Sequence, residues 1–95
     1  MLAPDIARRL FDLLAEDAYF NDESCGLGAY YVENHLQEIE EAVRSQGYDG
    51  PPLRLAGHHY PTHGAVYWIY DPERLTHEEA RRLSDQWVSQ AQRRP

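Results

Sequence analysis

The chain has 95 residues, 42% hydrophobic and 26% charged, which predicts one folded domain over residues 1–95 and argues against intrinsic disorder. It has one cysteine, no apolar run near the roughly 18 residues of a membrane span and no signal-peptide features, so we expect a cytoplasmic protein without membrane contact. The net charge of −7 argues against nucleic acid as a direct ligand, because binding phosphate requires positive charge.

Two helices are predicted in the first half of the chain. Pro4 and Asp5 suit a first helical turn, and apolar residues then recur at three- and four-residue spacing, which predicts a helix over residues 4–19. Turn-forming residues and two glycines follow. The same spacing predicts a second helix over residues 29–46, which Gly47 would end.

A β-hairpin and a third helix are predicted in the second half. Residues 53–60 and 65–70 are rich in strand-forming types, with a four-residue loop between them. The second run is apolar or aromatic on both faces, so it is either covered on both sides or uses one face for contact. Thr76 and Glu79 form a capping box for a helix that ends near residue 92.

The predicted fold is a small α+β domain in the order helix-helix-strand-strand-helix, with the hairpin packed on three helices. A two-stranded hairpin is marginal by itself. Either the three helices therefore cover one of its faces, or the sheet continues into another subunit.

The negative charge is concentrated in the first half. Residues 1–50 hold eleven carboxylates and three arginines, whereas residues 51–95 hold five carboxylates and six arginines. Because no Lys or Arg lies between Leu10 and Val43, this stretch should project a negative field that local ion pairs cannot cancel. Tyrosines lie among these acidic residues and suit a protein interface, although some of these tyrosines could equally lie in the hydrophobic core. The expected partner-binding residues are Asp12, Glu16, Asp17, Asp22, Glu23, Tyr30, Tyr31, Glu33, Glu38 and Glu41.

These features favour a protein binder over an enzyme. An acidic surface attracts a basic partner, so the leading hypothesis is a stoichiometric inhibitor, a DNA mimic that masks the basic nucleic-acid-binding surface of another protein. Small anti-CRISPR, anti-restriction and immunity proteins provide a class analogy, and no motif in the chain matches a family. A regulatory homodimer joined through the hairpin edge is another alternative.

A small metal- or thiol-dependent hydrolase is the remaining alternative. Cys25 precedes the second helix, His58 or His59 lies on the first strand and Asp71 ends the second strand, which is the chain order of a papain-like site. The carboxylates around Cys25 would raise the pKa of its thiol, so we expect an ordinary free cysteine. His58, His59 and His63 are weak metal candidates, because adjacent strand residues point to opposite faces and only a pair across the turn could share an ion. We therefore expect no catalytic residue, metal or cofactor.

Overall fold

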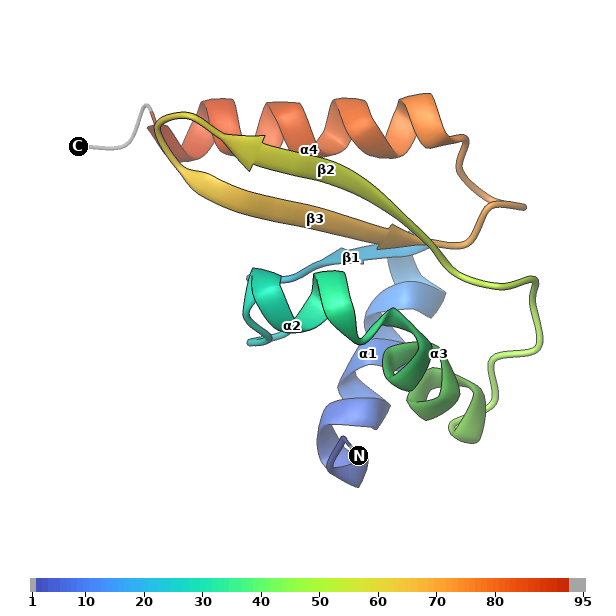
Figure 1. The fold of residues 1–95 in the computed structure, drawn as a ribbon. Helices are drawn as coiled ribbons and strands as arrows, with labels where there is room; N and C mark the ends of the chain where they lie inside the picture. Colours follow the sequence, from blue (N-terminus) through green and yellow to red (C-terminus); the bar gives the residue numbers. More distant parts are fainter. Residues whose placement is uncertain (1, 93–95) are drawn as a thin grey trace.

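The computed structural model describes residues 2–92, which form a three-stranded antiparallel sheet between two layers of helices (Figure 1). The helices are α1 (Pro4–Asp17), α2 (Ala29–Asn34), α3 (Leu36–Ser45) and α4 (His77–Gln92), and the strands are β1 (Tyr19–Asn21), β2 (Arg54–Tyr60) and β3 (Gly64–Tyr70). The strand order is β1-β3-β2, so β3 lies in the centre and β2 forms an edge. The predicted α+β fold class is confirmed.

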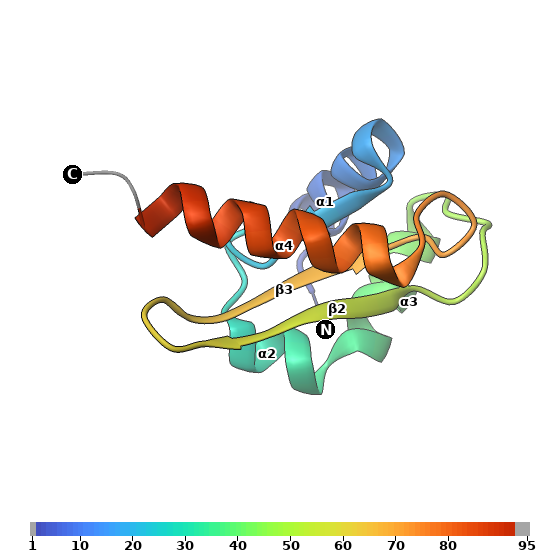
Figure 2. The same cartoon turned by 90° about the horizontal axis from the view of Figure 1, so that it is seen from above.

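Strand β3 is buried on both faces, which confirms the first of the two alternatives for this segment. On one face Val66, Trp68 and Tyr70 pack with Ala80 and Val88 of α4. Helix α4 runs lengthwise over the hairpin on this side (Figure 2). The helices therefore cover both faces of the sheet rather than one.

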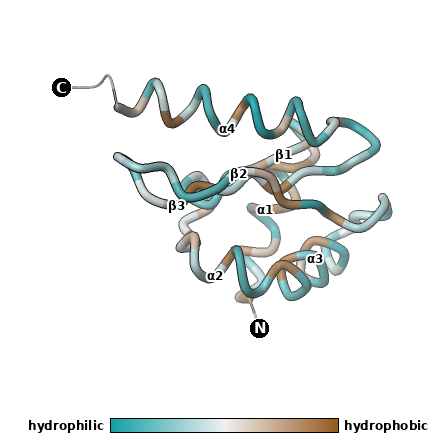
Figure 3. Tube along the Cα trace, turned by 45° about the horizontal axis from the view of Figure 1, so that its top comes forward, coloured by the Kyte–Doolittle hydropathy of each residue, from teal (hydrophilic) through white to brown (hydrophobic). Residues whose placement is uncertain are grey.

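The opposite face of β3 belongs to the larger part of the core. Tyr67 and Ile69 pack there with residues from α1 and α3, among them Leu10, Ile39 and Val43. Hydrophobic and hydrophilic positions alternate along α3 and α4, as expected for helices that bury one face (Figure 3). Among residues 2–92, no helix is both long and apolar enough to cross a bilayer.

The structure contains a strand that the sequence did not predict. Helix α1 ends at Asp17, because Ala18 adopts a left-handed conformation with φ of 67° and its N–H bonds to the Leu14 carbonyl at 2.7 Å. The next three residues form β1, in which Tyr19 is paired with Tyr70 of β3. The hairpin is thus widened by a strand of the same chain.

The predicted second helix is interrupted at His35. This residue has φ of −129° and ψ of 31°, which are not helical values, and it caps both the end of α2 and the beginning of α3. Its ring stacks on Tyr31 at 4.3 Å between centroids. The stripe formed by Val32, Ile39 and Val43 is buried as predicted, so the burial pattern continues across the break.

Side chains fix the beginning of α4 and the end of α1. The predicted capping box at α4 is confirmed, since the Thr76 N–H donates to Glu79 Oε1 at 3.0 Å and the Glu79 N–H donates to Thr76 Oγ1 at 3.1 Å. These hydrogen bonds lower the pKa of Glu79. Two residues before Thr76, Arg74 donates to the Leu14 carbonyl at 3.2 Å, where a cation suits the end of α1.

Gly57 lets α4 approach β2 closely. Its φ of +115° suits glycine, and a Cβ at this position would collide with the Val66 carbonyl oxygen and lie 3.2 Å from Ser84 Oγ of α4. Ser84 is fully buried and its hydroxyl lies 2.8 Å from the Tyr60 hydroxyl. A side chain at Gly57 would therefore disturb both the hairpin and its contact with α4.

We expect Gly57→Ala to lower the free energy of unfolding by about 2 kcal/mol or more, since it adds a collision to an unfavourable φ. Gly64→Ala is the matched control, because Gly64 has φ of +97° and a Cβ there would meet no other atom within 4 Å. Urea denaturation of both variants measures the difference. Equal losses would show that the collision at Gly57 is relieved without cost.

Candidate functional site

The acidic residues of the first half are spread over several surfaces. Asp12 and Glu16 are exposed and share one face of α1, because residues four apart lie above one another on a helix. Asp17 and Glu23 are exposed on either side of β1. Glu33 of α2 and Glu41 of α3 are exposed as well, and Glu38 of α3 is half-buried.

Arginines that flank the acidic stretch in sequence reach back to it in space. Arg8 pairs with Asp12 at 3.3 Å and Arg44 pairs with Glu40 at 3.4 Å. The expectation that local ion pairs could not cancel the negative field was therefore wrong at these two carboxylates. Glu41 forms no ion pair with any residue in the described part of the chain. The charge of Glu41 is therefore not offset by an ion pair with any of these residues.

Asp22 is a correction to the predicted set, because its side chain is only 2% exposed. Its Oδ1 accepts a hydrogen bond from the Tyr67 N–H at 3.2 Å, which attaches the loop after β1 to β3. Burial raises the pKa of this carboxyl group, and the negative charge of Glu23 raises it further. A partner cannot reach Asp22, so it holds the loop in place instead.

The two tyrosines of α2 have different environments. Tyr30 is 78% exposed and is the only large hydrophobic residue in residues 2–92 that is this open to solvent. Tyr31 is half-buried, and its hydroxyl donates to Glu38 Oε2 at 2.7 Å. This hydrogen bond lowers the pKa of Glu38 and favours its charged form. Tyr30 is therefore free for contact, whereas Tyr31 positions a carboxylate.

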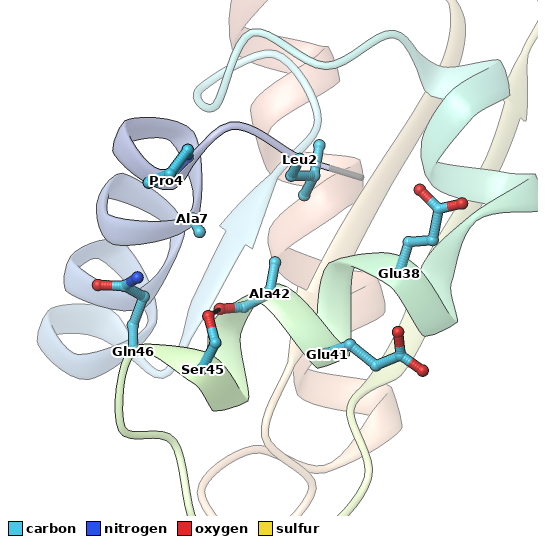
Figure 4. A pocket seen from close by; sticks show the side chains of 8 residues that line it. All are labelled: Leu2, Pro4, Ala7, Glu38, Glu41, Ala42, Ser45 and Gln46. Atoms are coloured by element: carbon cyan, nitrogen blue, oxygen red, sulfur yellow. Dashed lines mark hydrogen bonds between the residues drawn. The ribbon is translucent and has the colours of Figure 1, made fainter.

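A groove of about 460 Å³ lies beside these residues, between α3 and the beginning of α1 (Figure 4). Leu2, Pro4 and Ala7 line it on the α1 side, and Ala42 faces them from α3. Ala7 is almost fully buried, so the floor of the groove lies deep between the two helices. The lining on this side is apolar.

Carboxylates lie at one end of the same groove. The side chains of Glu38 and Glu41 extend from α3 there, and the Gln46 amide lies at the other end (Figure 4). Sequence reasoning found the two glutamates but missed the groove, because α1 and α3 are not adjacent in the chain. Ala42 was the one usable sequence signal for the groove. It is a small residue on the solvent side of α3, four positions after Glu38 and three positions before Ser45.

The three hairpin histidines lie beside different acidic residues. His58 Nε2 lies 3.8 Å from Asp85 of α4, whereas His59 Nε2 lies 3.9 Å from Glu33 of α2. The prediction that these neighbours point to opposite faces is therefore confirmed. The Nε2 of His63 lies 3.9 Å from Glu23, and its ring packs edge-on against Trp87 of α4 at 5.2 Å between centroids. Within residues 2–92, no three His, Cys, Asp or Glu side chains are grouped so that they could hold a metal ion.

Cys25 and Asp71 are held apart by the second half of β3. Cys25 is 6% exposed and its thiol lies 3.4 Å from the Asp22 carbonyl oxygen, in the loop that bonds to Tyr67 in the middle of the strand. Asp71 follows the last residue of β3, where its N–H donates to the Ala18 carbonyl at 3.2 Å. The four residue steps from Tyr67 to Asp71 span about 13 Å along the strand. The papain-like order of residues is therefore not assembled into a site.

Comparisons of the chain with models of protein families, with curated proteins and with solved structures found no match. The function must therefore be inferred from the residues and the fold of this chain. Strand β2 is one edge of the sheet, so a homodimer joined through this edge stays a prediction.

We expect the Asp22→Asn variant to become more stable relative to the wild type as the pH rises. Asn keeps an oxygen that can accept the Tyr67 N–H but carries no charge. Because the pKa of folded Asp22 is raised above 3.8, the wild type loses stability relative to the variant as the pH rises from that value through the folded-state pKa.

Urea denaturation between about pH 3 and pH 7 measures this difference. Glu16→Gln, at an exposed carboxylate of α1, is the matched control for removal of one negative charge. The assignment would be contradicted if the wild type became more stable relative to Asp22→Asn as the pH rises.

Cys25 is expected to react slowly with a thiol reagent in the folded protein. Burial raises the pKa of the thiol, so less thiolate is present than in a free cysteine. At about pH 8, we expect the native protein to react with Ellman's reagent at least about tenfold more slowly than the urea-unfolded chain. Equal rates would revive the thiol-dependent alternative.

Proposed function

We propose that this protein is a stoichiometric inhibitor that binds a basic protein through α2 and α3 and masks its nucleic-acid-binding surface. The observation that carries the proposal is an exposed aromatic side chain, Tyr30, in a helical layer rich in carboxylates. We call this region the acidic surface and define it by Tyr30 and Glu33 of α2 and by Glu38 and Glu41 of α3.

The uneven distribution of charge supports this assignment. The first half of the chain carries a net charge of −8, from eleven carboxylates and three arginines, and contributes three of the four helices. On α4, Arg81 pairs with Asp85 and Arg82 pairs with Glu78, both at 3.4 Å. The electric field of the molecule therefore directs a basic partner to the side of the sheet that holds α2 and α3.

The chemistry of the acidic surface suits a competitor of nucleic acid. Proteins that bind nucleic acid present arginine and lysine side chains to phosphate groups, and carboxylates can accept the same hydrogen bonds. An exposed tyrosine adds a large contact area at a low cost in side-chain entropy. Inhibitors of nucleases such as anti-CRISPR, anti-restriction and immunity proteins work through protein contacts of this kind, and we propose a similar role in the cytoplasm.

Affinity purification from the native host, followed by mass spectrometry, identifies the partner. The partner is then tested for binding to labelled duplex DNA or RNA by fluorescence anisotropy. We expect an equimolar amount of this protein to abolish that binding. Recovery of no basic protein, or unchanged nucleic-acid binding in its presence, would contradict the proposal.

Charge reversal at the acidic surface should slow association with the partner. We expect Glu41→Arg to lower the association rate constant by about tenfold at low salt and to reduce its dependence on salt concentration. Glu78→Arg on α4 makes the same change in net charge on the opposite layer and is the matched control. Surface plasmon resonance over a range of salt concentrations measures both, and equal effects would show that the acidic surface is not the contact.

A further inference from the structure

The groove beside the acidic surface exists because two small residues meet there. Ala7 of α1 and Ala42 of α3 both line it, and α1 packs directly on α3. Larger side chains at these positions would fill the space between the helices. The volume of about 460 Å³ lies within the roughly 300–1,000 Å³ of sites that hold small ligands or anchoring side chains.

Helix α3 has a second stripe that is separate from its core stripe. Ile39 and Val43 are fully buried in the core. Glu38, Glu41 and Ala42 instead line the groove, and their spacing of three and four residues places them on one side of the helix. This stripe combines an apolar methyl group with two carboxylates, so it suits a ligand with both apolar and cationic parts.

The charge at the groove argues against a second copy of this chain as the occupant. A copy with a net charge of −7 would bring like charges together, which opposes association. The partner of the proposed function is basic. Arginine and lysine extend aliphatic stems over apolar surface while their charged ends reach carboxylates.

We infer that the groove is the anchor site of the proposed interface and receives an apolar side chain of the basic partner that is flanked by arginine or lysine. The apolar side chain contacts Leu2, Pro4 and Ala42 above the floor formed by Ala7, and a flanking cation meets the exposed carboxylate of Glu41. This assignment rests on the proposed function and adds to it the kind of sequence that the partner presents.

Short peptides test the inference with the full chain. Acetyl-Arg-Leu-Leu-Arg-amide carries both features, acetyl-Arg-Gly-Gly-Arg-amide has the same charge without apolar side chains, and acetyl-Glu-Leu-Leu-Glu-amide has the opposite charge. Titration of the ¹⁵N-labelled protein is followed by two-dimensional NMR. We expect the first peptide to shift the amide signals of Ala7, Ala42 and Ser45, and to bind at least about fivefold more tightly than the other two.

The Ala42→Leu variant fills the groove without a change of charge. It should weaken binding of the Arg-Leu-Leu-Arg peptide by about fivefold or more and leave the glycine peptide unaffected. Ala15→Leu is the matched control, at an exposed alanine near the other end of α1. If Ala42→Leu does not fold, Glu41→Gln replaces it, and we expect weaker binding of both arginine peptides.

Two results would overturn the groove as an anchor site. One is equal binding of the leucine and glycine peptides with shifts spread over α2 and α3, and the other is an absence of groove shifts with the leucine peptide. Neither result contradicts the proposed function. That function is tested separately, by the effect of Glu41→Arg on the association rate constant with the intact partner protein.

Discussion

Strand β3 pairs with a strand on each side and is covered by helices on both faces. Residues 66–70 are all buried, so each of them has to fit a packed environment. The rest of the fold is arranged around this strand. Helix α4 needs Gly57 in order to approach the neighbouring strand, and the loop after β1 is attached to β3 through Asp22. The layer that carries the acidic surface is therefore positioned by a strand that itself has no charged residue.

Local patterns account for the elements that could be predicted from the sequence. The helices α1 and α4 have regular apolar spacing and local start signals, and the hairpin has a short loop between two strand-rich runs. Strand β1 has only three residues, and its partner Tyr70 lies 51 positions after Tyr19, from the register of the pair. No local pattern encodes such a pairing. The break at His35 was missed because the apolar stripe continues through it in phase, from Val32 to Ile39.

The candidate site was predicted in composition but not in geometry. Counting charges along the chain found Glu38 and Glu41, yet it could not show that Arg8 and Arg44 neutralise nearby carboxylates or that Asp22 is buried. These outcomes depend on distances between residues, which a linear sequence does not contain. The groove needs the contact of α1 with α3, so its alanines resemble ordinary helix residues until the helices are packed.

The pairing of β1 with β3 has a consequence for how the protein can be divided. The two halves of the chain differ strongly in charge, but β1 comes from the acidic half and its pairing partner in the sheet comes from the nearly neutral half. Residues 1–50 alone would keep all eleven carboxylates of that half and would lose the strand and apolar face on which they are arranged. The acidic surface is therefore not a transplantable module. An engineered binder derived from it would have to retain the hairpin, although the hairpin contributes none of the acidic residues.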